Sequence, residues 1–326
     1  MKLRVIVPCF NETDVLHQTI QELTEILEKD SLDQSYDYDM LFVDDGSQDD
    51  TMTLLQQAAA QSPHVKFISF SRNFGKEAAM IAGFEHSTDC DAVVMIDADL
   101  QHPPELIPEM VQAYREGYDQ IIAKRNRAGE HASRKWVTRL YYKMINYFIE
   151  DIELEDGVGD FRMLSQRAVC SLVSLKEYNR FSKGLFSWIG YNSKVIHYEN
   201  VEREAGESKW SFRSLLNYAI DGLISFNYKP LRTMIYLGLL IFGVSMIYII
   251  YLFIDTLIHG VDVPGYFTMI AAVLFIGGIQ LVSIGVIGEY IGRIYYEVKQ
   301  RPKYIVEASN VGTPKSHNET QQDVSI

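Results

Sequence analysis

Two carboxylates, Asp97 and Asp99, stand one residue apart at the end of an apolar run, and this pair is the first candidate for chemistry. The run 93–96 is continuously apolar, which is typical of a strand covered on both faces of a parallel sheet. Pro103 and Pro104 follow, and they end the strand because proline cannot donate a ladder hydrogen bond. Both carboxylates are therefore expected at the carboxyl end of a strand, where open α/β sheets bind ligands.

Three further polar clusters come directly after apolar runs. The runs cover residues 3–7, 40–43 and 65–70, and they lead into Asn11-Glu12, Asp44-Asp45 and Arg72-Asn73. Since the carboxyl ends of parallel strands meet at one edge of a sheet, all four clusters are expected to share one site. Carboxylates gathered in one place repel each other unless a cation or ligand compensates them. The sequence therefore predicts a metal-assisted nucleotide site, with Mg²⁺ or Mn²⁺ suited to the oxygen ligands.

The elements that must position these clusters alternate between strand and helix. Apolar runs at 3–7, 40–43, 65–70, 93–96 and 121–123 are separated by segments of helical spacing. This alternation predicts an α/β fold with a mostly parallel, Rossmann-like sheet flanked by helices. The G-x-G-x-x-G and P-loop patterns are absent from the sequence, which argues against a dinucleotide site and a P-loop NTPase. The net charge, −16 over residues 1–120 and +3 over the remainder, argues against nucleic-acid binding.

Two long uncharged stretches predict a membrane anchor. Thr233–Ile254 and Phe267–Gly288 have 22 residues each, enough to cross a hydrocarbon core of about 30 Å. The intervening loop has no lysine or arginine, whereas the outer flanks carry Lys229, Arg232, Arg293, Lys299, Arg301 and Lys303. The positive-inside rule then predicts a multi-pass protein of the cell membrane, with both termini and the sheet domain in the cytoplasm.

Between the sheet and these stretches the sequence becomes basic and aromatic. From Arg134 to about residue 150, lysines and arginines interleave with aromatic residues, which favours an amphipathic helix in the membrane interface. The alternative is a basic helix packed on the domain. Trp210–Tyr228 is a second candidate for an interfacial segment. The chain is thus divided into a nucleotide-sugar-binding part (1–123), an acceptor-binding part (124–228), a two-helix anchor (229–306) and a disordered tail (307–326).

Together the motifs resemble those of family 2 glycosyltransferases with the GT-A fold. The similarity is strongest to the polyprenyl-phosphate branch, which includes dolichol-phosphate mannose synthase and bactoprenol glucosyl transferases. It runs from about residue 3 to residue 303 and is carried by Pro8-x-Phe10-Asn11-Glu12, Asp44-Asp45-Gly46-Ser47, Ser71-Arg72-Asn73-x-Gly75-Lys76, Asp97-Ala98-Asp99-Leu100-Gln101 and Arg203-x-x-Gly206-x-Ser208-Lys209-Trp210. The Q-x-x-R-W motif of processive synthases is absent from the sequence.

The resemblance implies the transfer of glucose or N-acetylglucosamine, with inversion, from a UDP-sugar to polyprenyl (undecaprenyl) phosphate. The product would be a lipid-linked sugar for cell-surface glycosylation. Mg²⁺ or Mn²⁺ would be held by Asp97, Asp99 and Gln101. The donor would be bound by Pro8, Phe10, Glu12, Asp44, Asp45, Lys76, Asp97, Ala98, Arg203 and Lys209.

The acceptor phosphate would be bound by four basic residues: Arg125, Arg127, Arg134 and Lys135. For each of them the alternative partner is an anionic lipid headgroup. Asp160, in Gly159-Asp160-Phe161-Arg162, is the expected base or acceptor orienter; the alternative is a structural salt bridge to Arg162 or another arginine. His102 is interpreted as a structural residue that caps or packs.

The resemblance also implies a homotetramer, together with a flippase and an outer-face glycosyltransferase as functional partners. Two alternatives remain at this point. One is a nucleotide-sugar-binding membrane scaffold without turnover. The other is a glycosyltransferase for a diacylglycerol-type lipid, although a neutral hydroxyl acceptor does not need a cluster of phosphate-binding arginines.

Overall fold

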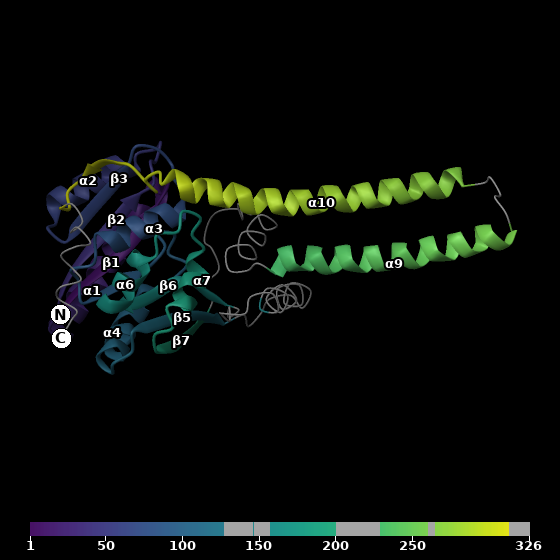
Figure 1. Cartoon of the computed structure of the whole chain (residues 1–326). Coiled ribbons are helices and arrows are strands. Elements are labelled where there is room, and N and C mark those ends of the chain that lie inside the picture. Colours follow the sequence, from purple (N-terminus) through teal and green to yellow (C-terminus); the bar gives the residue numbers. More distant parts are fainter. Residues whose placement is uncertain (127–145, 147–156, 200–228, 260–264, 313–326) are drawn as a thin grey trace.

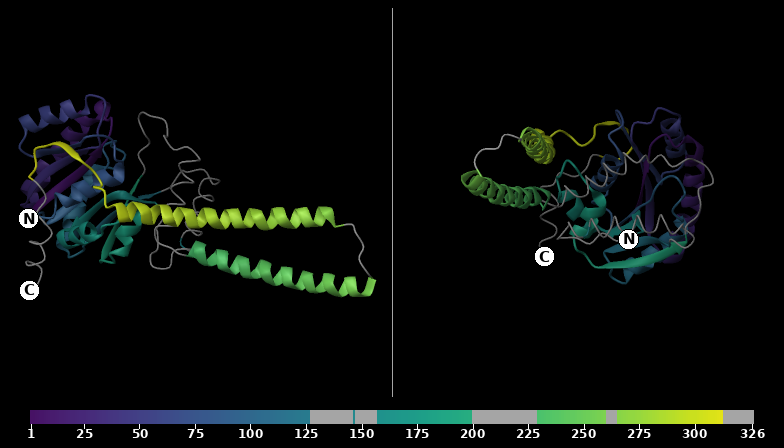
Figure 2. Two further views of the ribbon diagram at one scale, coloured as in Figure 1. Left: turned by 45° about the horizontal axis from the view of Figure 1, so that its top comes forward. Right: turned by 90° about the vertical axis from the view of Figure 1, so that its right-hand side faces the viewer.

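The computed structural model describes residues 1–126, 146, 157–199, 229–259 and 265–312. It shows a sheet domain from which two long helices run away side by side (Figures 1 and 2). The predicted interfacial helix from Arg134 and the second candidate, Trp210–Tyr228, lie outside the described residues.

The described part of the chain forms one eight-stranded sheet with the order β7-β5-β6-β4-β1-β2-β3-β8. Its centre, β3-β2-β1-β4, is parallel, as the sequence predicts. β6 lies antiparallel between β4 and β5, and β8 lies antiparallel on the free edge of β3. The sheet is therefore mixed at its flanks. The strands are β1 (Lys2–Cys9), β2 (Asp37–Asp44), β3 (Val65–Phe70), β4 (Ala92–Met95), β5 (Gln120–Asn126), β6 (Val158–Ser165), β7 (Ser193–Glu199) and β8 (Val306–Ser309).

Helices cover both faces of the sheet, which explains why the central strands are continuously apolar. Val5 and its neighbour Ile6 point to opposite faces, and each belongs to a different buried cluster. One cluster includes α1 (Thr13–Gln34), α2 (Thr51–Gln61) and α4 (Ile107–Arg115), which follows the short 3₁₀ turn η1 (Pro104–Leu106). The other includes α3 (Lys76–Glu85), α6 (Gln166–Ser174) and α7 (Ser182–Trp188).

One glycine allows α3 to lie close to the sheet. A Cβ at Gly83 would stand 2.4 Å from the Ile6 Cγ2 atom, well inside van der Waals contact. The close approach brings the amino end of α3, with Lys76, against the carboxyl edge of the central strands. Packing at Gly83 therefore helps to set the position of a charged side chain about two helical turns away.

The helical hairpin consists of α9 (Lys229–His259) and α10 (Tyr266–Lys299), and it confirms the two predicted helices. Within them, Thr233–His259 and Phe275–Lys299 are long and apolar enough to cross a membrane, and neither is buried against the protein. Many large apolar side chains on both helices are exposed, for example Ile247 and Leu281 at 71% and 72%. This pattern fits a lipid environment.

The predicted disordered tail from residue 307 is wrong at its start. Residues 306–309 form β8, which pairs with β3. The segment is short and polar, so its composition alone does not predict a strand. The edge of β3 offers it unpaired backbone groups, and pairing with that edge is what makes it a strand. Residues 313–326 lie outside the described residues.

Candidate active site

The loops that follow β1 and β2 are tied together at the carboxyl edge of the sheet. The Asn11 backbone N–H donates to Ser47 Oγ at 2.9 Å, and the Glu12 N–H donates to Thr51 Oγ1 at 3.0 Å. Asn11 has a φ of 54°, a left-handed conformation that asparagine tolerates well. The predicted convergence of these loops is confirmed. The predicted donor-binding residues of the first loop are half-buried or exposed: Pro8, Phe10 and Glu12.

Asp44 and Asp45 are almost completely buried, and both already accept hydrogen bonds from the protein. Asp44 accepts from the Ser47 N–H at 3.1 Å and from Ser69 Oγ at 2.7 Å. Asp45 accepts from the backbone N–H groups of the residue pair 74–75, at 2.6 and 2.8 Å. Asp45 therefore shapes the loop after β3. Contact of either carboxylate with the nucleotide-sugar donor stays a prediction.

The turn after β4 presents the two carboxylates of the Asp-x-Asp motif. Between them, the Ala98 side chain is buried among apolar side chains. Only the main chain of Ala98 is therefore available for the predicted contact with the nucleotide-sugar donor. Thr19 of α1 donates its hydroxyl to the Ala98 carbonyl oxygen at 2.8 Å and holds the turn. Asp99 accepts a hydrogen bond from the Gln101 N–H at 3.2 Å, and Leu100, which lies between these two residues, has a φ of 54°. These hydrogen bonds hold the turn in which Asp97 and Asp99 lie half-buried at the end of the strand.

Lys76 joins the Asp-x-Asp motif to Asp160. Its Nζ atom lies 2.6 Å from Asp97 Oδ1 and 2.7 Å from Asp160 Oδ2. The Lys76 side chain is 45% exposed, whereas Asp97 and Asp160 are 25% and 17% exposed. Three residues from three separate segments therefore share one charged contact at the carboxyl edge, and a ligand can reach it from the Lys76 side.

The antiparallel register of β6 brings Asp160 to this place. Arg162 of β6 pairs with Met95 of β4. Asp160 lies two residues before Arg162, and Asp97 lies two residues after Met95, so antiparallel pairing places the two carboxylates opposite each other. The structural alternative for Asp160 was a salt bridge to an arginine. Among the described residues, Lys76 makes an ion pair with Asp160, while the Arg162 guanidinium lies over the Phe186 ring, 3.7 Å from its centroid.

The opposite charges of Lys76 and Asp160 stabilise each other. Burial raises the pKa of Asp160, but the charges of Lys76, Lys183 and Arg162 outweigh burial and lower the pKa to about 2. Burial lowers the pKa of Lys76, whereas Asp160 and Asp97 raise it, and the net change is upward. Asp160 is therefore a carboxylate, and Lys76 an ammonium, throughout the neutral pH range.

His102, interpreted from sequence as structural, lies directly behind Asp97. Its ring packs on Phe161 and Tyr198, with centroids 5.3 and 6.3 Å away. Its Nδ1 atom is 3.8 Å from Asp97 Oδ2 and has no hydrogen-bond partner among the described residues. Burial lowers the pKa of His102 and favours the neutral ring. The ring contacts confirm that His102 packs within the domain, and its position three residues after Asp99 was the available signal that it borders the site.

The acceptor side of the site is described only in part. Arg125 lies in β5, where its N–H donates to the Gly157 carbonyl oxygen at 3.0 Å and its strand partner is Tyr198. Tyr198 packs on His102, so Arg125 lies near the Asp-x-Asp turn. The other predicted acceptor and donor contacts fall outside the described residues: Arg127, Arg134, Lys135, Arg203 and Lys209.

The carboxylate oxygens at this edge suit a divalent metal that is also held by water and by the substrate. Among the described residues, no group of three or more histidine, cysteine, aspartate or glutamate side chains is arranged to hold a metal. Asp97 and Asp99 supply carboxylates from a single turn. One or two carboxylates are the protein share that Mg²⁺ uses when waters and substrate phosphates complete its octahedron. The residues therefore fit a metal that arrives with its substrate, and not a closed metal site.

Comparison with known proteins places this geometry in a family. Residues 4–172 match the family model "Glycosyl transferase family 2", and residues 229–294 match "GtrB C-terminal hairpin". The chain therefore belongs to glycosyl transferase family 2 and is an enzyme of the glycosyltransferase class. Membership confirms the resemblance drawn from the motifs.

The curated relatives cover almost the whole chain, whereas the solved structures cover less of it. The chain is 53% identical over 309 residues to "Putative glycosyltransferase CsbB" of Bacillus subtilis (strain 168), which covers 95% of this chain and 92% of that protein. It is 41% identical to the SfII prophage-derived bactoprenol glucosyl transferase of Shigella flexneri, over 96% of this chain and 100% of that protein. Among solved structures, mannosyl-3-phosphoglycerate synthase from Rubrobacter xylanophilus is 18% identical, with a TM-score of 0.44 over 72% of this chain and 74% of that one.

Proposed function

We propose that the chain is a membrane-anchored glycosyltransferase that moves glucose from UDP-glucose to undecaprenyl phosphate. The observation that carries the proposal is the Lys76 contact between Asp97 and Asp160 at the carboxyl edge, in a chain that matches bactoprenol glucosyl transferases from end to end. Glucose is preferred to N-acetylglucosamine because those relatives are named for glucosyl transfer. The product is a lipid-linked sugar for cell-surface glycosylation.

The reaction needs little proton transfer. An oxygen of the acceptor phosphate forms a bond to C1 of the sugar, while the bond from C1 to the donor's diphosphate oxygen breaks and UDP leaves. Attack from the opposite face inverts C1. A phosphate monoester has a second pKa of about 6, so at neutral pH the acceptor is already an anionic nucleophile.

These conditions favour an orienting role for Asp160 over a role as general base. A carboxylate with a pKa of about 2 is a weak proton acceptor, and the acceptor phosphate has no proton to give up. Asp160 instead holds the Lys76 ammonium at 2.7 Å and fixes its position beside Asp97. In this proposal Lys76 meets the diphosphate oxygens of the donor, and Arg125 meets the acceptor phosphate from β5.

A divalent ion, Mg²⁺ or Mn²⁺, neutralises charge on the leaving diphosphate when it is bound. Asp99 is the first candidate ligand, with Asp97 and Gln101 beside it. Asp97 already neutralises Lys76 through Oδ1, which leaves its second oxygen for the metal. The protein's part is to hold these oxygens in one turn, through the bond between Thr19 and Ala98.

In this proposal α9 and α10 anchor the enzyme in the cell membrane, with the basic flanks and the sheet domain on the cytoplasmic side. The polyprenyl acceptor then reaches the site from the inner leaflet. A homotetramer, a flippase and an outer-face glycosyltransferase are the expected partners. Two alternatives are a sugar-nucleotide scaffold without turnover and a transferase for a diacylglycerol-type lipid.

The test is a transfer assay with the purified full chain in lipid, undecaprenyl phosphate, and radiolabelled UDP-glucose, UDP-N-acetylglucosamine or GDP-mannose. We expect labelled lipid from UDP-glucose, with Mg²⁺ or Mn²⁺ present, and its loss with EDTA. Label in diacylglycerol but not in undecaprenyl phosphate would replace the acceptor. Donor binding without any labelled lipid would favour the scaffold. Labelled lipid that persists in EDTA would refute metal dependence.

A further inference from the structure

The end of α10 is attached to the sheet domain. The Tyr178 N–H donates to Glu297 Oε1 at 2.7 Å, and the Tyr178 and Tyr296 rings are stacked with centroids 5.4 Å apart. At Gln300, with a φ of 47°, α10 ends, and the chain continues along the sheet domain to β8 (Figure 1). The hairpin is thus joined to the domain at its base and through the segment that follows.

We call residues 304–311 the C-terminal strap. The strap covers the free edge of β3 through β8, whose register pairs Ser309 with Ile68 and Val306 with Phe70. Asn310 extends this pairing with its side chain, because Oδ1 accepts from the Phe67 N–H at 2.7 Å. Nδ2 of Asn310 donates to the carbonyl oxygen at residue 65 at 3.3 Å. β3 is therefore held along its length by residues that lie more than 230 positions later.

Tyr304 holds the last residue of β3. Its ring is stacked on Phe70, with centroids 4.9 Å apart, and its hydroxyl donates to Glu85 at the end of α3. The next residue of the strap, Ile305, accepts the Ser71 N–H at 3.0 Å. The strap therefore binds β3 at the point where the strand gives way to the loop 71–75.

That loop leads directly to Lys76. Phe74 packs edge-on against Phe70, with centroids 5.8 Å apart, and Asp45 accepts the N–H groups of Phe74 and Gly75. Gly75 has a φ of 97°, and Lys76 is the first residue of α3. Tyr304 thus contacts Phe70, Phe70 contacts Phe74, and two residues later Lys76 reaches the carboxylates of the site.

We propose that the C-terminal strap is a positioning segment for the transfer reaction, and that Tyr304 places the 71–75 loop so that Lys76 stands between Asp97 and Asp160. The segment that follows the second membrane helix would then help to build the active site, and attachment of the hairpin would be a condition for full activity. Tyr304 acts through Lys76 and does not touch substrate.

The kinetic test, which rests on the proposed transfer activity, compares full-length variants in lipid. Tyr304→Ala removes the stacking on Phe70, and we expect kcat to fall ten- to a hundred-fold, as misplaced catalytic groups do. Tyr304→Phe keeps the ring and should lose less than fivefold. Tyr236→Ala, at an exposed position of α9, is the matched control and should keep kcat.

A double-mutant cycle separates positioning from general destabilisation. In a Lys76→Ala background, Tyr304→Ala should lower kcat less than twofold further, because its route to the site is already cut. An equal loss in both backgrounds would overturn the proposal, as would an unchanged kcat in Tyr304→Ala itself.

A second measurement does not depend on activity. Hydrogen exchange of Tyr304→Ala should speed up at the amides of Phe74 and Gly75, while peptides from α4 on the opposite face stay as in the wild type. If the exchange rates at residues 71–76 were the same in Tyr304→Ala and in the wild type, the proposed role of the strap would be overturned even if the wild type transfers sugar. Failure of the wild type to transfer sugar, with faster exchange at 71–76 in the variant, would overturn the proposed function and leave the strap's placement of the loop supported.

Discussion

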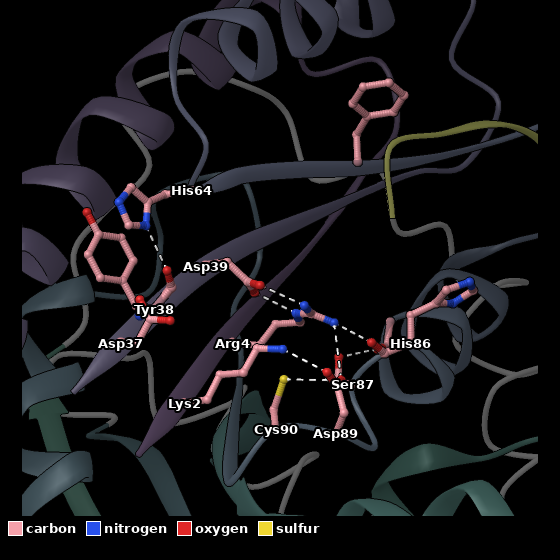
Figure 3. Close-up of polar contacts among 12 residues, drawn as sticks. Lys2, Arg4, Asp37, Tyr38, Asp39, His64, His86, Ser87, Asp89 and Cys90 are labelled. Carbon is pink, nitrogen blue, oxygen red and sulfur yellow. Dashed lines mark hydrogen bonds and ion pairs between the residues drawn. The ribbon is translucent and has the colours of Figure 1, made fainter. Parts of the chain in front are cut away.

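A cation is paired with carboxylates at both ends of the parallel strands, at the amino edge where β1 and β2 begin and at the carboxyl edge where they end. The two cations differ in donor geometry and in exposure. At the amino edge, Arg4 binds Asp39 with a two-pronged contact, Nε–Oδ1 at 2.5 Å and Nη2–Oδ2 at 2.6 Å (Figure 3). Nη1 of Arg4 donates to the His86 carbonyl oxygen, and Lys2 pairs with Asp89 at 2.7 Å nearby. The Arg4 and Asp39 side chains are 5% and 12% exposed.

At the carboxyl edge, one ammonium replaces the guanidinium fork. Lys76 meets Asp97 and Asp160 through a single nitrogen and is 45% exposed. Arginine matches a carboxylate with several fixed donors, whereas lysine is a point charge on a flexible stem. The first arrangement is closed to ligands and the second can exchange partners. Exposure and donor geometry, more than charge, therefore distinguish the structural cluster from the cluster proposed to act in catalysis.

The largest expected effect breaks the carboxyl edge. Asp99→Asn removes the charge proposed for the metal, and kcat should fall on the order of 10³-fold. Asp99 lies half-buried in a turn, so the free energy of unfolding should change by only about 0.5 kcal/mol or less. Transfer assays and thermal melts of the same preparation measure both. A variant with more than a tenth of wild-type kcat would contradict the metal role.

Breaking the amino edge should reverse this pattern. Arg4→Met leaves Asp39 buried without its partner and should cost about 3–5 kcal/mol of folding stability. The kcat per folded molecule, measured well below the melting temperature, should stay within about twofold of wild type because this edge lies away from the site. The double variant Arg4→Met/Asp39→Leu should regain most of the lost stability. No regain would mean that the cluster stabilises the fold by another route.

The exposed cation sharpens the comparison. Lys76→Gln should lower kcat about ten- to a hundred-fold through lost charge. Lys76→Arg should keep more activity than Lys76→Gln, since it keeps the charge with a different geometry. The expected fall in melting temperature is smaller than for Arg4→Met, because the Lys76 side chain is 45% exposed and solvent screens its ion pairs, although Asp160 loses its main counter-charge. If Lys76→Gln destabilised the protein as much as Arg4→Met, the distinction between the edges would be lost.

The smallest effect is on pH-dependent stability. The pKa of Asp160 is lowered to about 2, against about 3.9 for an unfolded aspartate. Its contribution is therefore fully present above pH 4 to 5 and is lost as the pH falls toward 2. The melting-temperature difference between wild type and Asp160→Asn should be constant from pH 5 to 8 and shrink below pH 4. A difference that changes between pH 6 and 8 would place the titration elsewhere.

Much of the amino-terminal part of the sheet domain follows from local sequence pattern. Continuous apolar runs of strand length determine β1 to β4, and the clusters after them determine which edge carries the site. Asp97 and Asp99 are placed by the end of their own strand. The helical hairpin is equally local, because an uncharged stretch of more than 20 residues has few other structures available. These features need only neighbouring residues.

Only the tertiary structure decided how distant segments complete the site. β6 separates β5 from β4 and carries Asp160 opposite Asp97, although Val158–Ser165 has no strong strand pattern. Lys76 contacts Asp160, which lies 84 positions later in the sequence. β8 follows the hairpin in the sequence and pairs with β3. Strand register and edge pairing depend on backbone groups that become available once the sheet exists, and no local periodicity encodes them. The sequence motifs therefore predict which chemical groups the site contains, and the pairing of strands in the folded sheet determines which of these groups come into contact.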